Sequence, residues 1–184
     1  MPYLAQRGIG SGFNSVLFTD VRNIEEVREC VKAASPDHPD YGGSYGVATR
    51  RNSYMGYGGN PDYIQTIADT VLVFMIEKKG AVDNLEEILE EPSVEMIQWG
   101  GSDYSVSIGH PGEAKHPDVV AAKKKTFTTA IKMGVPPRGE VRNAEEVKEY
   151  LDMGVKHFSV NTDITILYEF WKTEGEKILK ALDS

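Results

Sequence analysis

The segment that decides the fold is DTVLVFMIEKKGAVDNLEEIL, residues 69–89. Its six consecutive apolar residues, 71–76, are typical of a strand that is buried on both faces of a parallel sheet. This strand ends on Glu77, and the residues after it predict a helix. Because an unpaired buried charge costs free energy, a carboxylate at the end of such a strand points to a specific role for Glu77.

Strands and helices alternate along the rest of the chain. We expect strands at residues 15–21, 70–77, 94–100, 135–141 and 156–160, and helices at 22–34, 82–92, 118–134, 143–154 and 163–182. A loop is expected at 101–117. This alternation predicts an α/β fold with a parallel sheet and right-handed crossovers. A doubly wound sheet and a TIM barrel both fit the pattern, although a complete barrel needs eight strands and usually about 250 residues.

Composition and charge narrow the class of protein. The chain has 184 residues, of which 40% are hydrophobic and 26% charged, which is ordinary for a globular domain. Its net charge of −8 argues against a nucleic-acid partner. The sequence shows neither a long apolar run nor the pattern of a signal peptide, so we expect no membrane partner and a cytoplasmic location. The single Cys30 falls on the apolar stripe of the helix at 22–34 and is expected to be a core thiol.

Three carboxylates follow expected strands, namely Asp20, Glu77 and Asp103. Glu77 and Asp103 are 26 residues apart, about one βα unit, so they should converge at the ends of neighbouring strands. Two adjacent carboxylates repel unless a cation lies between them, and ligation by oxygen alone suits Mg²⁺ or Mn²⁺. In the alternative interpretation, Glu77 pairs with a neighbouring lysine and Asp103 caps the following turn.

The remaining polar candidates are less specific. Successive glycines at Gly100 and Gly101 can form a backbone nest for a substrate carboxylate, or simply a turn. The four histidines show no metal-ligand spacing, and we expect them to have surface or loop-fixing roles. The arginines at 50–51 fit either an anionic ligand or solvent. An apolar stripe on the terminal helix (Ile164, Leu167, Tyr168 and Trp171) predicts packing within the subunit or against a partner.

The segment from residue 73 to residue 122 resembles the HpcH/HpaI aldolase and citrate lyase family of metal-dependent pyruvate aldolases. The shared features are an apolar strand ending in Ile-Glu, a helix like AVDNLEEI, and the run GGSDYSVSIGHPGEAKHPDV. Residues 15–33, the loop YGGSYGVATRR and the late segment HFSVNTDITIL also fit the family. Within the family, the sequence is most similar to 2-dehydro-3-deoxyglucarate aldolase-like enzymes, which act on 2-keto-3-deoxy sugar acids.

The resemblance implies a function and a set of site residues. Glu77 and Asp103 match the ligands of a divalent metal, Mg²⁺ or Mn²⁺ with Co²⁺ as a further candidate. Gly101 and Ser102 match the backbone that holds the pyruvate carboxylate. The implied reaction is cleavage of a 4-hydroxy-2-oxo acid to pyruvate and an aldehyde. The implied assembly is a dimer-based homo-oligomer, up to a hexamer, in which the terminal helix at 162–182 is exchanged between subunits.

The sequence also departs from the family pattern. It matches strands four to eight of a phosphoenolpyruvate/pyruvate-type TIM barrel, as one partial domain over residues 1–184. The family's catalytic base histidine and its arginine have no counterpart that we can place, so the catalytic residues remain unassigned. Met75 stands where many members have glutamine. Two alternatives to an autonomous aldolase therefore stay open: a truncated or non-catalytic metal-binding subunit, and an acyl-CoA lyase of the citrate lyase branch.

Overall fold

Five parallel strands form one sheet in the computed structural model, which describes residues 2–47 and 59–183. The strands are β1 (Ser15–Phe18), β2 (Val71–Ile76), β3 (Met96–Trp99), β4 (Pro137–Val141) and β5 (His157–Val160). They lie side by side in chain order, β1-β2-β3-β4-β5. A doubly wound sheet reverses direction at a switch point, whereas a barrel adds strands in sequence. The fold is therefore part of a TIM-type barrel, as predicted.

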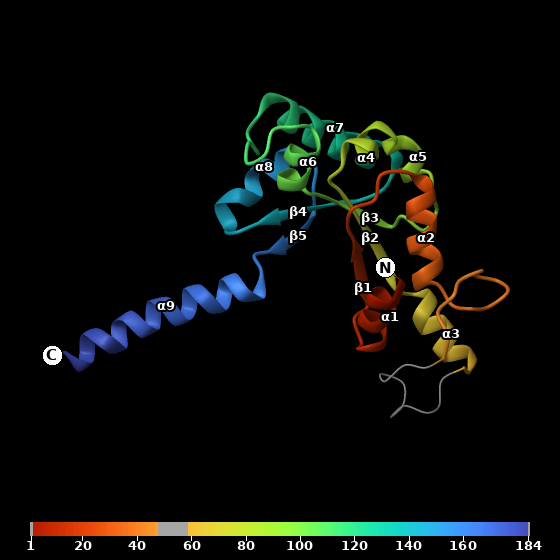
Figure 1. Ribbon diagram of the computed structural model, residues 1–184, viewed down its shortest axis with the longest axis horizontal. Helices are drawn as coiled ribbons and strands as arrows, with labels where there is room; N and C mark the ends of the chain where they lie inside the picture. The colour runs from red at the N-terminus through yellow and green to blue at the C-terminus, as the bar shows by residue number, and fades with distance from the viewer. Residues whose placement is uncertain (1, 48–58, 184) are drawn as a thin grey trace.

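Helices follow the strands as expected for βα units (Figure 1). In the described residues they are α1 (Pro2–Gly10), α2 (Ile24–Ala34), α3 (Pro61–Ala68), α4 (Lys79–Asp83), α5 (Leu85–Leu89), α6 (Gly101–Ser107), α7 (Pro117–Met133), α8 (Val147–Asp152) and α9 (Asp163–Leu182). Local sequence explains several ends. The side chain of Asn23 accepts the amide N–H of Glu26 at the start of α2, and Gly134 ends α7 with a φ of 83°.

Two predictions in this region were wrong. Residues 101–117 are not all loop, because α6 occupies Gly101–Ser107. The single helix expected at 82–92 is instead two short helices that meet at Asn84, whose side chain donates to the carbonyl of Gly80. The arginines at 50–51 lie outside the described residues.

The two faces of β2 have different surroundings. Leu72, Phe74 and Ile76 belong to the main apolar core, together with Leu85 of α5 and Phe127 of α7. They therefore form the outer, helix-covered face of the sheet. Since successive residues of a strand point to opposite faces, the residues between them point to the inner face, which would line the barrel.

The terminal helix α9 extends away from the rest of the molecule (Figure 1). None of its described residues is buried, although it carries many apolar side chains. Ile164 is 73% exposed, Leu167 55% and Trp171 67%. The packing predicted for this stripe is therefore absent within the subunit. No helix among the described residues is both long and apolar enough to span a membrane.

Candidate active site

Glu77 follows the last residue of β2 and is only 4% exposed. Its Oε1 accepts a hydrogen bond from the backbone N–H of Asp20 at 2.8 Å. Asp20 comes just after β1 and has a positive φ of 67°. Burial raises the pKa of the Glu77 carboxyl; the hydrogen bond from Asp20 opposes this rise, and the nearby charge of Asp103 adds to it. A buried carboxylate with one oxygen anchored by an amide is therefore fixed at the carboxyl ends of two neighbouring strands.

Gly100 packs directly against this carboxylate. A Cβ atom at position 100 would lie 2.6 Å from both Cβ and Oε2 of Glu77, and 3.0 Å from the Met75 sulfur. The two distances of 2.6 Å are shorter than real Cβ atoms show, and the 3.0 Å distance to the sulfur is tight. The second oxygen of Glu77, Oε2, therefore lies against position 100, where a larger residue than glycine would force a shift.

Asp103 lies in the first turn of α6, and its side chain is 59% exposed. Lys78 connects it to Asp20, because the Lys78 ammonium nitrogen lies 3.2 Å from Asp103 Oδ1 and 2.8 Å from Asp20 Oδ1. Lys79 instead pairs with Asp83. Both lysines therefore pair with carboxylates other than Glu77. The Lys78 ammonium group lies between Asp20 and Asp103.

These contacts fit a hard divalent ion on chemical grounds. Glu77 and Asp103 are close enough for the charge of Asp103 to raise the pKa of Glu77. Glu77, Asp103 and Asp20 offer carboxylate oxygens, the ligands that Mg²⁺ and Mn²⁺ prefer.

Gly101 and Ser102 form the N-terminal turn of α6. A Cβ atom on Gly101 would come within 2.9 Å of the indole nitrogen of Trp99, so this glycine too is required by close packing. The carbonyl of Ser102 accepts the hydroxyl of Ser105 at 2.7 Å, which tightens the turn. Their amides begin a helix next to Asp103.

A polar cluster on β3 and β4 was missed from sequence. Arg138 Nε donates to Gln98 Oε1 at 2.6 Å, and Gln98 Nε2 donates to Glu140 Oε2 at 3.2 Å. Gly139 packs against the Tyr150 ring of α8, so Arg138 and Glu140 point to the opposite, inner face. The sequence signal for this cluster was the alternation, along β4, of charged residues at 138 and 140 with small or apolar ones. Burial lowers the pKa of Arg138.

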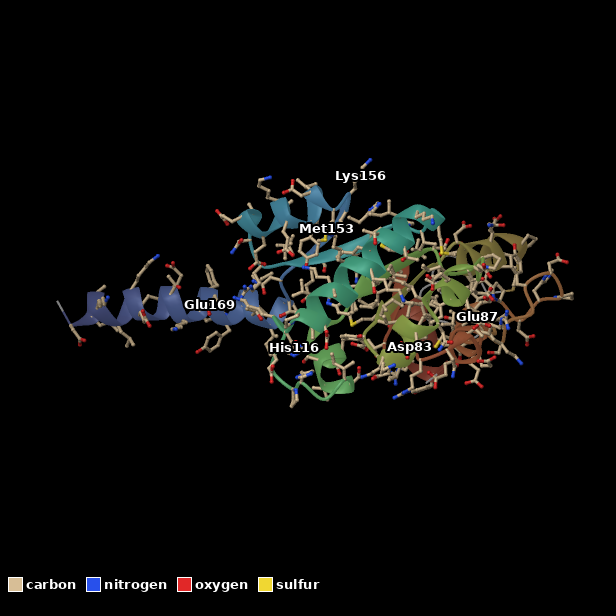
Figure 2. All side chains as sticks on the ribbon, turned by 90° about the horizontal axis from the view of Figure 1, so that it is seen from above. Asp83, Glu87, His116, Met153, Lys156 and Glu169 are labelled. Carbon is tan, nitrogen blue, oxygen red and sulfur yellow. The ribbon has the colours of Figure 1, made fainter. Side chains whose placement is uncertain are left out.

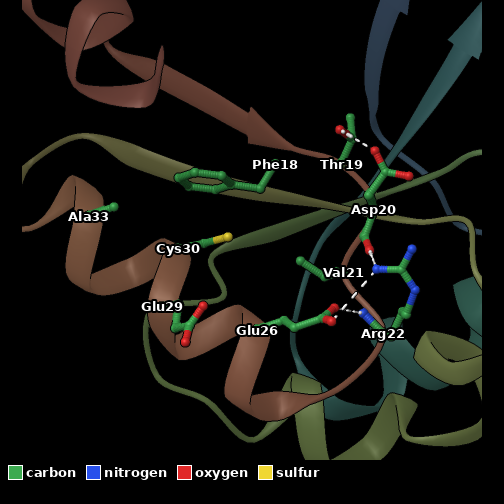
Figure 3. Close-up of a pocket in the computed structure, with 9 residues that line it drawn as sticks. All are labelled: Phe18, Thr19, Asp20, Val21, Arg22, Glu26, Glu29, Cys30 and Ala33. Carbon is green, nitrogen blue, oxygen red and sulfur yellow. Dashed lines mark hydrogen bonds and ion pairs between the residues drawn. The ribbon is translucent and has the colours of Figure 1, made fainter. Parts of the chain in front are cut away.

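A pocket of about 230 Å³ lies between β1 and α2 (Figure 3). Phe18, Cys30 and Ala33 form its apolar wall, and Glu26 and Arg22 its polar side. Burial raises the pKa of the Cys30 thiol. The pocket adjoins the backbone of Asp20 but lies on the side of β1 that α2 covers. It is therefore separate from the contact between Glu77 and Gly100.

Comparison with known proteins identifies the relatives of the chain. The sequence profile of the HpcH/HpaI aldolase/citrate lyase family matches residues 3–168. A 4-hydroxy-2-oxo-heptane-1,7-dioate aldolase of Escherichia coli is 31% identical over 85% of this chain and 59% of its own length. A hydroxypyruvate/pyruvate aldolase of Paraburkholderia phytofirmans is 27% identical over 88% of this chain and 63% of its own. The chain thus spans about three fifths of the length of these curated relatives.

Solved structures support the same fold. A HpcH/HpaI aldolase/citrate lyase family protein from Burkholderia cenocepacia superimposes with a TM-score of 0.81, covering the whole of this chain and 70% of that one, at 23% identity. The citrate synthase SbnG superimposes with a TM-score of 0.73 at 19% identity, over 98% of this chain and 69% of that one. The family profile covers most of the sequence, and the chain belongs to the HpcH/HpaI aldolase/citrate lyase family.

Proposed function

We propose that this chain carries the metal-binding half of a class II pyruvate aldolase, which cleaves a 4-hydroxy-2-oxo acid such as a 2-keto-3-deoxy sugar acid to pyruvate and an aldehyde. The observation that carries the proposal is the buried Glu77 carboxylate at the end of β2, whose Oε1 is anchored by the Asp20 amide at 2.8 Å and whose Oε2 lies against Gly100. Two relatives whose names describe aldolases of oxo acids support the reaction class.

Glu77 and Asp103 are the residues that would hold Mg²⁺, Mn²⁺ or Co²⁺. When bound, such an ion supplies Lewis acidity toward the carboxylate and keto oxygens of the oxo acid. The amides of Gly101 and Ser102 would orient the substrate carboxylate, since N–H groups at the start of a helix favour an anion. The Asp20 N–H would fix the orientation of the Glu77 carboxyl group, since it holds one of its oxygens.

The reaction breaks the bond between C3 and C4 of the oxo acid. The hydroxyl on C4 loses its proton to a base and becomes the aldehyde, while C3 gains a proton to complete pyruvate. From the family resemblance, we expect the base histidine and an arginine to belong to βα units that precede β1 in the barrel. Turnover therefore requires those units from another polypeptide or from additional sequence.

The sheet has the surfaces that such an assembly requires. Within the described residues, β1 and β5 are edge strands whose outer sides lack a strand partner, and exposed edges of this kind are normally covered. The apolar stripe of α9 offers a second surface. We expect α9 to pack against another copy of the chain in a dimer-based homo-oligomer, up to a hexamer, as the family resemblance implies.

The test combines purified protein, Mn²⁺ or Mg²⁺, pyruvate and a panel of aldehydes, with aldol products detected by mass spectrometry. The variant is Glu77→Gln. The matched control is Glu95→Gln, because Glu95 Oε2 also accepts a backbone N–H, from Leu72 at 2.8 Å, but at the start of β3 rather than after the end of a strand. Mn²⁺ binding by wild type and Glu95→Gln but not by Glu77→Gln supports the proposal, and aldol product with the same dependence on Glu77 would show that this chain also supplies the catalytic base.

Other outcomes separate the alternatives. If wild type binds Mn²⁺ but forms no product with any aldehyde, the chain acts as a metal-binding subunit and the autonomous aldolase is excluded. If Glu77→Gln binds Mn²⁺ as tightly as wild type, the metal site is wrong. Cleavage of an acyl-CoA thioester in place of aldol chemistry would support the citrate lyase branch.

A further inference from the structure

The connection between α6 and α7 brings together three potential metal ligands that are separate in the sequence. They are His110, Glu113 and His116, and their ligating atoms all lie within 4.8 Å of one another. The two imidazole rings stack with centroids 3.7 Å apart and planes inclined by 20°. His110 Nδ1 lies 3.7 Å from Glu113 Oε2. Sequence spacing gave no sign of this arrangement of His110 and His116, for which we expected surface or loop-fixing roles.

The backbone holds this cluster in place through successive turns. The amide of His110 donates to the Ser105 carbonyl at 2.8 Å, that of Glu113 to the His110 carbonyl at 3.1 Å, and that of His116 to the Glu113 carbonyl at 2.9 Å. Gly109 and Gly112 adopt positive φ angles of 87° and 82°, which glycine tolerates without strain. The loop backbone thus brings the three residues close together.

His116 has a second role, since it caps α7 (Figure 2 labels it at the start of this helix). Its Nδ1 accepts the Asp118 amide at a long 3.3 Å, and it also lies 3.8 Å from Asp118 Oδ2. If Nδ1 instead carries the proton and donates to the Asp118 carboxylate, Nε2 becomes free to bind a metal. This carboxylate–histidine–metal arrangement is the usual way in which proteins orient a ligating imidazole.

The distances suit a first-row metal once one imidazole rotates out of the stack, because nearly parallel rings direct their nitrogen lone pairs along parallel planes. Ligands placed about 2.0–2.1 Å from a tetrahedral zinc lie about 3.3 Å from one another. The present separations of up to 4.8 Å exceed this by little more than an ångström. His110 and His116 are 34% and 24% exposed, so an ion can enter and water can complete its coordination. Two imidazoles and one carboxylate favour a borderline ion such as Zn²⁺ over Mg²⁺.

We propose that His110, Glu113 and His116 form a second metal site, which binds Zn²⁺ or a similar borderline divalent ion and is separate from the site at Glu77 and Asp103. The ion would tie the loop after α6 to the first turn of α7. Because α6 carries Asp103 in its first turn, occupation would also make the segment that bears Asp103 more rigid.

The experiment measures Zn²⁺ binding by calorimetry and Co²⁺ binding by visible absorption in a Glu77→Ala background. That background removes the hard-ion site, so the result does not depend on the proposed aldolase function. We expect one ion per chain, an increase in thermal midpoint with Zn²⁺, and at least about tenfold weaker binding in His110→Ala, as is typical when metal coordination is damaged. His116→Asn should weaken binding similarly. Because asparagine can still cap α7, this variant tests the site even if His110→Ala fails to fold.

The matched control is His38→Ala, since His38 also lies near a carboxylate, 3.6 Å from Asp40, but outside the cluster. It should bind Zn²⁺ and Co²⁺ as the background protein does. Equal binding by the His110, His116 and His38 variants would overturn the second site, and so would the absence of any saturable Zn²⁺ binding in the background protein. Neither result would bear on Mn²⁺ binding at Glu77, which is measured in the wild-type background.

Discussion

The backbone N–H of Asp20 donates a 2.8 Å hydrogen bond to Oε1 of Glu77, across 57 residues of sequence. The bond joins the residues just beyond two neighbouring strands and fixes the orientation of a buried carboxylate. The hydrogen bond favours the ionised form of Glu77, which burial disfavours. The other carboxylate oxygen lies against Gly100.

The pH dependence of stability should reveal this buried group. Burial raises the pKa of Glu77 above its ordinary value of 4.5, so its contribution to stability is fully present below that value and is lost as pH rises through the raised pKa. In the presence of a chelator, Glu77→Gln should lose less thermal stability than wild type as the pH rises above 4.5. Parallel melting curves for the two proteins across this range would contradict the assignment.

Gly100→Ala should damage the site sterically. The new Cβ would lie 2.6 Å from Glu77 Oε2, so we expect a loss of about 1–3 kcal/mol in the free energy of unfolding, together with weaker Mn²⁺ binding. Gly175→Ala is the control, because no atom lies within 4 Å of its added Cβ in α9. Denaturant titration checks the first effect and calorimetry the second. Unchanged Mn²⁺ affinity in Gly100→Ala would place the ion elsewhere.

Removing the ammonium of Lys78 should strengthen divalent-metal binding. Lys78 lies between Asp20 and Asp103 and competes for the oxygens that a metal would use. Exposed ion pairs are worth about 0.2–1 kcal/mol, so Lys78→Gln should raise Mn²⁺ affinity by roughly 1.4- to fivefold. Lys79→Gln removes an equal charge that pairs with Asp83 and should have a smaller effect. Weaker binding in Lys78→Gln than in Lys79→Gln would mean that Lys78 organises the acids rather than blocking them.

The exposed apolar stripe of α9 predicts self-association. Replacing Leu167 and Trp171 by aspartate should convert an oligomer to smaller species, because these side chains are 55% and 67% exposed in the single subunit. Light scattering after size-exclusion chromatography measures the mass. Lys172→Asp, on the same helix, controls for added negative charge. A monomeric wild type would remove the basis for an exchanged helix.

Much of the fold could be predicted because the strong signals were local. The apolar run of β2 predicted a buried strand, and Asn23 and Gly134 marked helix ends that the structure confirms. The helix α6 was missed because GSDYSVS has no apolar period and includes weak helix formers. It forms through tertiary contacts, since Tyr104 and Ser105 are buried and the Tyr104 ring lies 4.8 Å from that of Trp99.

The candidate site, too, could be predicted only in part from the sequence. Sequence spacing predicted that Glu77 and Asp103 would lie near one another, and the influence of Asp103 on the Glu77 pKa agrees with that placement. The bridging position of Lys78 could not be predicted, because it depends on where Asp20 turns after β1. The cluster of His110 and His116 was also hidden, since it depends on two glycine turns within one loop.

The sequential order of the strands has a consequence for assembly. Each strand pairs with the one that immediately precedes or follows it in the described sheet, so no connection crosses the outer side of β1. A further βα unit could therefore join at that edge without unthreading any existing segment. We therefore expect this strand order to be compatible with complementation in trans, in which two separately folded pieces reconstitute one barrel.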